Sequence, residues 1–339
     1  MSMKFLITGI SGFIGCYLFD QLNRPEHTII GLDLCEPPQN AAPAFSLDSS
    51  RHRGRRAGVN GEARCRFVQL DVRDATACER IVAEEQPDRL FHLAGAKASQ
   101  PLADLLNINV LGTAHILEAV RRHSPRSTVL FAGSGALYGP VPERQMPITE
   151  DLPPDPVTLN GISKAAADLM CRHYAKTHDM KVIRVRTFNA VGPGQSEDFV
   201  CSAFARQLAE VKFGLREPVL RTGNLDSMRD FVDVRDVACG FEKLARDGAP
   251  GIAYNLCSGR AVRIKEVLER LIEISGLAVT TIQEPGRLQK SDVSAQRGSY
   301  ERALKVCGWQ PEISLQHSLE DLYRDWCERI KRRLNDELV

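Results

Sequence analysis

Short apolar runs alternate with longer amphipathic segments through the first 134 residues. Residues 4–8 form an apolar run that predicts a buried strand, and residues 13–22 carry apolar side chains at helical spacing. The same alternation predicts strands at 27–32, 66–70, 89–93 and 128–132, and helices ending near residue 85 and covering about 103–122. Strands separated by crossover helices align in parallel, with helices on both faces of the sheet. The pattern therefore predicts an α/β fold with a doubly wound parallel sheet.

Three glycines, Gly9, Gly12 and Gly15, lie between the first predicted strand and the first predicted helix. Residues without a Cβ let the backbone approach a pyrophosphate, and the amino end of the helix favours its negative charge. Asp33 ends the second predicted strand, where a carboxylate accepts hydrogen bonds from ribose hydroxyls and repels a 2′-phosphate. This indicates a Rossmann site that favours NAD over NADP. The alternatives are an ordinary glycine turn and a helix-capping aspartate.

The second half of the chain predicts a smaller lobe. Helical patterns cover 199–214 and 264–274. We expect an NAD-binding domain at 1–188 and a mainly substrate-binding lobe at 189–339, with returns to the larger lobe near 229–237 and 253–256. Residues 37–62 lose periodicity and contain several arginines. This segment is either a solvated loop or one whose arginines contact phosphates of cofactor, substrate or a neighbouring subunit.

Composition excludes several classes of function. Lys and Arg number 44 and Asp and Glu 43, so the net charge of +1 provides no field that would hold nucleic acid or an anionic membrane. The sequence has no apolar run of about 18 residues, and we expect a cytoplasmic protein. The 10 cysteines occur singly, and no Cys or His spacing suits zinc. We therefore expect no metal and no membrane or nucleic-acid partner.

A series of motifs in order resembles the extended short-chain dehydrogenase/reductases that act on nucleotide sugars, the epimerase/dehydratase group. The matching segments are 8–15 (TGISGFIG), 71–72 (DV), 92–96 (HLAGA), 109–113 (NVLGT), 134–139 (SGALYG), 188–195 (FNAVGPGQ), 229–234 (RDFVDV) and 255–259 (NLCSG). Segments 188–195 and 223–236 are most similar to reductases that convert GDP-4-keto-6-deoxymannose to GDP-rhamnose. The resemblance spans nearly the whole chain.

The resemblance implies a site for a nicotinamide dinucleotide, with NAD preferred to NADP, and for a nucleotide sugar. The cofactor-binding residues that it implies are Gly9, Gly12, Phe13, Ile14, Gly15, Asp33, Asp71, Val72, Leu93, Ala94, Gly95 and Lys164. The implied catalytic positions are Ser134, Asn160 and Lys164, and the implied substrate-binding residues are Asn189, Arg229 and Arg287. Family members form homodimers through helices that correspond to about 103–122 and 160–178, so we expect a homodimer.

The family's central Tyr-x-x-x-Lys pair is altered. Four residues bring both side chains to one helix face, but this chain has Asn160 before Lys164. In the family the lysine lowers the pKa of the phenol, which exchanges a proton as hydride moves. An amide donates a hydrogen bond but does not exchange that proton usefully. Three groups could supply the proton instead: Ser134 together with a water, Tyr138, or Lys164. We place Ser134 with a water first.

A second departure is Ala136, which occupies the position of an acidic residue in family dehydratases. Alanine cannot remove a proton beside a carbonyl, so a 4,6-dehydratase is disfavoured. We expect the reduction of a nucleotide-linked 4-keto-6-deoxy sugar. The alternatives are an epimerase or isomerase with retained NAD, and a catalytically weak protein that binds NAD or a nucleotide sugar.

Overall fold

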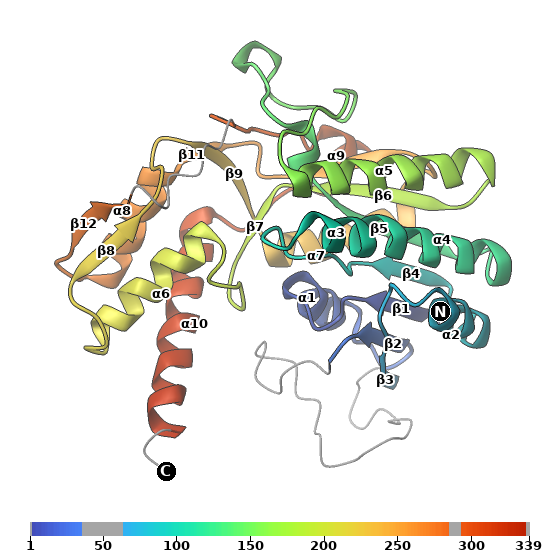
Figure 1. The fold of residues 1–339 in the computed structure, drawn as a ribbon, viewed down its shortest axis with the longest axis horizontal. Coiled ribbons are helices and arrows are strands. Elements are labelled where there is room, and N and C mark those ends of the chain that lie inside the picture. Colours follow the sequence, from blue (N-terminus) through green and yellow to red (C-terminus); the bar gives the residue numbers. More distant parts are fainter. Residues whose placement is uncertain (1, 36–63, 285–292, 337–339) are drawn as a thin grey trace.

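A computed structural model describes residues 2–35, 64–284 and 293–336. The larger lobe contains a seven-stranded sheet in the order β10-β6-β5-β4-β1-β2-β3, and every pairing in it is parallel (Figure 1). Its strands are β1 (Lys4–Thr8), β2 (Thr28–Asp33), β3 (Arg64–Gln69), β4 (Arg89–His92), β5 (Thr128–Ser134), β6 (Val182–Thr187) and β10 (Ala253–Leu256). The predicted doubly wound α/β fold is confirmed.

Helices cover both faces of this sheet. One face packs against α1 (Phe13–Leu22), α7 (Val234–Asp247) and α9 (Glu301–Cys307), and the other against α2 (Ala75–Glu85), α4 (Gly112–His123) and α5 (Leu159–Thr177). Each face has its own apolar core, which includes Phe241 from α7 on one side and Ile116 from α4 on the other. Burial on both sides explains why the central strands read as continuous apolar runs.

The smaller lobe is built around three helices and two short sheets (Figure 1). The helices are α6 (Val200–Lys212), α8 (Ile264–Ser275) and α10 (Leu315–Asp336), and the strands are β7 (Asn189–Val191), β8 (Val219–Thr222), β9 (Met228–Asp233), β11 (Ala261–Arg263) and β12 (Thr280–Gln283). They share a third apolar core that includes Phe204, Leu268 and Leu322. The domain boundary near residue 188 stays a prediction.

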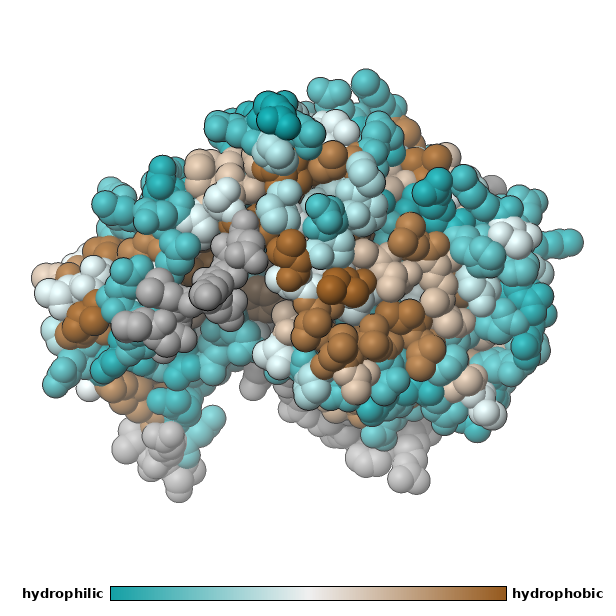
Figure 2. Space-filling view, turned by 45° about the horizontal axis from the view of Figure 1, so that its top comes forward, coloured by the Kyte–Doolittle hydropathy of each residue, from teal (hydrophilic) through white to brown (hydrophobic). Residues whose placement is uncertain are grey.

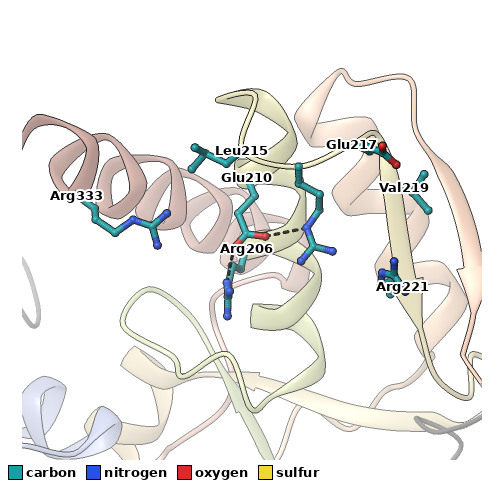
Figure 3. A pocket seen from close by; sticks show the side chains of 8 residues that line it. Arg206, Glu210, Leu215, Glu217, Val219, Arg221 and Arg333 are labelled. Carbon is teal, nitrogen blue, oxygen red and sulfur yellow. Dashed lines mark hydrogen bonds and ion pairs between the residues drawn. The ribbon is translucent and has the colours of Figure 1, made fainter. Parts of the chain in front are cut away.

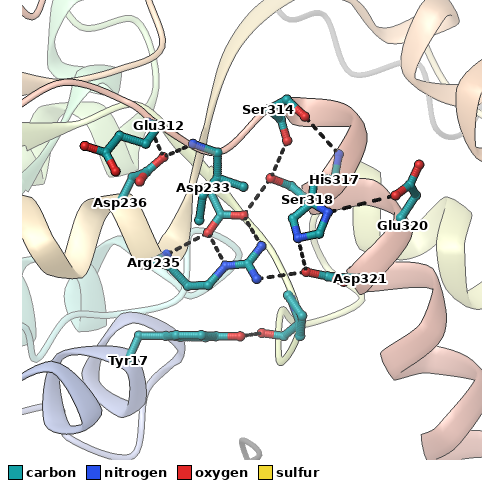
Figure 4. A network of polar contacts seen from close by, with 12 residues as sticks. Tyr17, Asp233, Arg235, Asp236, Glu312, Ser314, His317, Ser318, Glu320 and Asp321 are labelled. Atoms are coloured by element: carbon teal, nitrogen blue, oxygen red, sulfur yellow. Dashed lines mark hydrogen bonds and ion pairs between the residues drawn. The ribbon is translucent and has the colours of Figure 1, made fainter.

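Polar contacts join the two lobes on the side of α1. Arg235 in α7 pairs with Asp233 and also with Asp321 of α10, at 2.8 Å in both cases (Figure 4). The hydroxyl of Tyr17 in α1 donates to the carbonyl oxygen of Pro193, also at 2.8 Å. These contacts fix the smaller lobe beside the carboxyl edge of the parallel sheet, where ligands of doubly wound folds bind.

The sequence pattern predicted most element bounds in the first half, with one correction. The helix expected at 103–122 is divided into α3 (Leu102–Leu106), a π-helical turn (Asn107–Leu111) and α4. Apolar periodicity does not reveal such a turn, because one extra residue in a turn barely shifts the pattern. The arginine-containing segment 37–62 lies outside the described residues. In the described part of the chain, no helix is long and apolar enough to cross a membrane.

Candidate active site

The first glycine turn forms a cradle in which side chains have no room. Gly9 has φ of 73°, and a Cβ there would lie 2.7 Å from the nitrogen of Ala94. A Cβ on Gly15 would lie 2.3 Å from the carbonyl oxygen of Gly9. Both positions therefore require glycine. Gly12 caps α1 without a side-chain hydrogen bond, so no side chain competes for the first N–H groups of the helix, which begins at Phe13 and Ile14. This cradle fits a pyrophosphate.

Asp33 stands beside this turn at the end of β2. Its carboxylate accepts hydrogen bonds from the backbone N–H of Ser11 at 2.9 Å and of Leu34 at 2.8 Å. These bonds hold the carboxylate at the carboxyl edge of the sheet, where a dinucleotide ribose lies in this fold. The arrangement fits the ribose contact expected from the sequence, and that role stays a prediction.

Asp71 and Val72 follow β3 and differ in surroundings. The Asp71 carboxylate pairs with Arg73 at 2.6 Å, and this contact lowers its pKa. Val72 is buried, and a Cβ on Gly112 would lie 2.7 Å from its side chain. The close approach of Gly112 shows why the segment NVLGT carries a glycine. The adenine contact expected of Asp71 and Val72 stays a prediction.

The end of β4 brings Leu93, Ala94 and Gly95 to the same edge, next to Lys164 of α5. Leu93 N–H donates to the carbonyl oxygen of Thr8, and Ala94 N–H donates to the Thr8 hydroxyl. A Cβ on Gly95 would lie 2.8 Å from the Lys164 ammonium nitrogen. The absence of a side chain at Gly95 therefore lets the ammonium reach this edge of the sheet.

Burial of its ammonium group lowers the pKa of Lys164 to about 8. Within the described residues, this ammonium makes no hydrogen bond or ion pair. Burying a charge that has no partner costs free energy. A ligand whose hydroxyl groups accept hydrogen bonds from the Lys164 ammonium would lower that cost. Its position fits the expected contact with the ribose of a nicotinamide cofactor.

A buried chain of hydrogen bonds connects the ends of β1 and β4 to the helical segment that contains Asn109 and Thr113. The Thr113 hydroxyl donates to the carbonyl oxygen of Asn109 at 2.6 Å, so it accepts from Nε2 of His92 at 3.0 Å. Nδ1 of His92 then accepts from the Thr8 hydroxyl at 2.7 Å. Burial, followed by the charge of Lys164, lowers the pKa of His92 to about 3, so the ring is neutral. The Asn109 amide donates to the Ser163 hydroxyl, which ties the π-helical turn to α5.

Asn160 lies in the first turn of α5, one turn before Lys164. The hydroxyl of Thr158 caps the helix by accepting from Gly161 N–H at 3.0 Å. The backbone oxygen of Asn160 accepts from the Ser163 hydroxyl, while its side-chain amide makes no hydrogen bond to the described residues. The amide is therefore available to a ligand.

Ser134 ends β5 and lines a cavity of about 180 Å³ between the lobes. Its oxygen accepts from Ala136 N–H at 3.1 Å, so its own hydrogen remains available to donate to a ligand. The side chains that line the cavity include Ser134, Ala136, Thr158, Thr187, Phe188, Asn189, Arg229, Val293 and Gln296. Three of the expected site residues, Ser134, Asn189 and Arg229, thus meet in one cavity. Sequence reasoning missed Thr187, Val293 and Gln296.

Asn189 and Arg229 reach the cavity from neighbouring strands of the smaller lobe. The Asn189 amide donates to the carbonyl oxygen of Asp230 at 2.9 Å, and the Arg229 guanidinium donates to the carbonyl oxygens of Met228 and Val293. Burial lowers the pKa of Arg229, although a guanidinium remains charged at any ordinary pH. A fixed positive charge at the cavity wall suits a diphosphate. Arg287 lies outside the described residues.

Asp230 is a structural centre that the motif did not predict. Its fully buried carboxylate accepts from the backbone N–H groups of Ser258, Gly259 and Gly298 and from the Ser258 hydroxyl. Burial raises the pKa of Asp230 to about 6 despite these bonds. The carboxylate thus joins two loops, one with Ser258 and Gly259 and one with Gly298, to the strand β9 that carries its neighbour Arg229.

Tyr138 is committed to other contacts. Its buried hydroxyl donates to the Asn255 amide oxygen at 2.8 Å and accepts from the Arg186 guanidinium at 2.9 Å. Burial raises the pKa of Tyr138 to about 12. A hydroxyl that already donates and accepts a hydrogen bond, and whose pKa is raised, is poorly suited to donate a proton to a substrate.

A second hollow, of about 520 Å³, lies between α6, β8 and the end of α10 (Figure 3). Three of its four arginines pair with carboxylates: Glu210 pairs with Arg206 at 2.7 Å and with Arg216 at 2.8 Å, and Arg221 pairs with Glu284. This internal neutralisation leaves little positive field for an anion. The described residues contain no group of three or more His, Cys, Asp or Glu side chains that could hold a metal.

Comparisons with known proteins agree with this geometry. The model of the family described as GDP-mannose 4,6 dehydratase matches residues 6–322. The chain belongs to this family. It is therefore an enzyme of the extended short-chain dehydrogenase/reductase type, as the motifs predicted.

Proteins with several activities are similar to the chain. A GDP-6-deoxy-D-mannose reductase from Pseudomonas aeruginosa is 38% identical over 251 residues, which cover 73% of this chain and 83% of that protein. A UDP-glucose 4-epimerase from Mycolicibacterium smegmatis is 28% identical over 94% of this chain and 96% of its own length. The solved structure of RMD from Pseudomonas aeruginosa with NADPH has a TM-score of 0.78 at 30% identity, and the match covers 96% of this chain and 99% of that one.

Proposed function

We propose that the chain reduces a 4-keto-6-deoxy sugar linked to GDP. The observation that carries this proposal is Ala136 in the cavity wall beside Ser134. Ser134 has a hydroxyl hydrogen to give to a carbonyl oxygen, but Ala136 cannot remove the proton that a dehydratase removes. A site that polarises a carbonyl without abstracting a neighbouring proton fits reduction. The 38% identity to the Pseudomonas reductase supports the same reaction.

The chain's own residues have distinct tasks in this reaction. The turn at Gly9 and Gly15 and the carboxylate of Asp33 bind and orient the dinucleotide, and Lys164 holds its nicotinamide ribose. When bound, the reduced cofactor supplies the hydride. Arg229 holds the sugar diphosphate, and Ser134 donates a hydrogen bond to the carbonyl oxygen. A water at Ser134 delivers the proton that the family takes from tyrosine.

We further propose that NAD(H) is the cofactor, because the Asp33 carboxylate would repel a 2′-phosphate. The relative solved with NADPH makes this the feature to test first. Relative affinity for NADH and NADPH is measured directly by calorimetry. If the Asp33 carboxylate causes a preference for NADH, Asp33→Ala should reduce the ratio of the affinities for NADH and NADPH.

The proposed reaction is tested by mixing the pure protein with NADH or NADPH and GDP-4-keto-6-deoxymannose. We expect loss of the reduced cofactor and an equal amount of a GDP-linked 6-deoxyhexose. No product at stoichiometric enzyme would contradict reduction. Interconversion of UDP-glucose and UDP-galactose with cofactor retained through purification would instead identify an epimerase.

The role of Lys164 gives a pH prediction. Its ammonium loses a proton as pH rises through about 8, so affinity for the cofactor should fall above that pH, by at most about tenfold per unit. Lys164→Met should bind weakly at every pH and show no such fall. Lys176→Met, at an exposed position of the same helix, is the matched control and should keep the wild-type profile. A wild-type affinity that does not change between pH 7 and pH 9.5 would contradict this role.

We also propose a homodimer. Large apolar side chains on α3, the π-helical turn and α5 are exposed on one face of the larger lobe (Figure 2). They are Leu102, Leu106, Leu111, Leu159, Ile162 and Leu169, each 38% to 51% exposed. An exposed patch of this kind favours an interface, and a two-fold axis would bury it against itself.

The dimer is tested by a charge in this patch. Ile162→Glu should convert a particle of twice the chain mass into a monomer, because the interface would have to bury an unpaired carboxylate. Light scattering gives the mass. Ile282→Glu, at a 54% exposed position on β12, should leave the mass unchanged. A monomeric wild-type protein at micromolar concentration would contradict the proposal.

A further inference from the structure

Thr187 carries a buried hydroxyl that the fold leaves without a partner. The residue ends β6 and is only 6% exposed, and its Oγ1 makes no hydrogen bond in the described structure. Buried hydroxyls are nearly always bonded, because an unsatisfied one costs stability. Valine has almost the same shape and would fill this position without that cost. A threonine at this position is therefore explained if its hydroxyl bonds a ligand.

Thr187 stands next to Ser134 in the sheet. The two residues are register partners on the parallel strands β6 and β5, so their side chains project from the same face. Neighbouring strands lie about 4.8 Å apart, and both residues line the cavity of about 180 Å³. The Ser134 oxygen accepts from Ala136 N–H, and the two hydroxyls do not bond to each other. Both are thus left with a hydrogen to donate.

We propose that the hydroxyls of Thr187 and Ser134 donate hydrogen bonds to the same oxygen of the bound sugar. An oxygen between two donors at this separation lies within hydrogen-bond reach of both. The inference rests on the proposed function, in which this oxygen belongs to the carbonyl and gains negative charge during reduction. Two fixed donors stabilise that charge, and the second donor offsets part of what the missing phenol would supply. Thr187 is then a catalytic residue, since it touches the substrate.

The test compares Thr187→Val, which removes only the hydroxyl, with Thr187→Ser, which keeps it. With the keto sugar, Thr187→Val should lower kcat about tenfold to a hundredfold, with affinity for the reduced cofactor unchanged. Thr187→Ser should stay within about threefold of the wild type. A kcat for Thr187→Val equal to that of the wild type would overturn the inference.

The melting temperature of the ligand-free protein distinguishes this role from a structural one. Thr187→Val should raise it by about 2 °C, because an unsatisfied buried hydroxyl is removed. The matched control is Thr222→Val, at a buried strand end where the hydroxyl donates to the carbonyl oxygen of Ile282. That variant should melt below the wild type. A Thr187→Val protein that also melts below the wild type would show a structural hydroxyl and overturn the inference.

Calorimetry with GDP-mannose separates this inference from the proposed reaction. This ligand carries an oxygen at the same carbon, and Thr187→Val should bind it about tenfold more weakly than the wild type. If the wild type binds GDP-mannose but does not turn over the keto sugar, the proposed reaction fails, and the weaker binding of Thr187→Val still supports the contact. Equal affinity of wild type and Thr187→Val, or no binding by the wild type, would overturn the contact.

Discussion

Asn160→Tyr should raise turnover of the keto sugar about 10²-fold to 10⁴-fold, the range that a positioned proton donor contributes. The substitution introduces a phenol one helical turn before Lys164, whose ammonium lies beside Gly95 and makes no hydrogen bond or ion pair within the described residues. A nearby positive charge lowers the pKa of a phenol and so readies it for proton exchange. The first turn of α5 is fixed by the Thr158 cap, so the new side chain would start from a defined position.

Asn160→Phe is the matched control, because it supplies the ring without the hydroxyl. It should give no gain over the wild type. The measurement is kcat for both variants and the wild type under single-turnover conditions, which separate chemistry from product release. Equal rates for Asn160→Tyr and the wild type would show that the proton already has an efficient route, and would contradict the view that Asn160 limits the reaction.

Asp168→Asn should lower the free energy of unfolding by about 3–5 kcal/mol. Asp168 is fully buried in α5 and pairs with Arg184 at 2.5 Å and Arg186 at 3.0 Å. An amide in its place removes the carboxylate that pairs with both buried guanidinium groups. The same variant should lose affinity for the cofactor, because Asp168 lies one turn after Lys164 and fixes the helix that carries it.

Urea unfolding monitored by circular dichroism measures this loss. Asp151→Asn is the control: Asp151 also pairs with an arginine, Arg302 at 2.7 Å, but its side chain is 81% exposed. Exposed ion pairs contribute little, so this variant should unfold at the wild-type midpoint. An Asp168→Asn protein as stable as the wild type would show that the buried ion pairs do not hold α5 in place.

The sequence predicted the parts of the fold that depend on local pattern. The strand Lys4–Thr8 and the helix Phe13–Leu22 have the predicted bounds, because apolar spacing and the flanking glycines determine both locally. The helix α10 and the strands β8 and β12 were not predicted. Strand β12 is exposed at every position, so it has no apolar pattern to recognise. Helix α10 packs on α6, which is distant in the sequence, so its contacts depend on the tertiary fold.

The candidate site was predicted in part for the same reason. The motifs predicted Ser134, Asn189 and Arg229 as site residues, and the structure places all three at one cavity. Thr187 carries no signal in the sequence, because its importance depends on a hydroxyl that no neighbour in the described structure bonds. The lowered pKa of Lys164 could not be predicted from the sequence either, because it results from burial in the folded protein.

Calorimetric titration of the wild-type protein with NADH and with NADPH tests the central claim most directly. The glycine turn, the uncapped start of α1 and the Asp33 carboxylate together predict saturable binding of one dinucleotide per chain, with NADH at least about tenfold tighter than NADPH. Tighter binding of NADPH would contradict the role given to Asp33. No binding of either dinucleotide by folded protein would contradict the whole account.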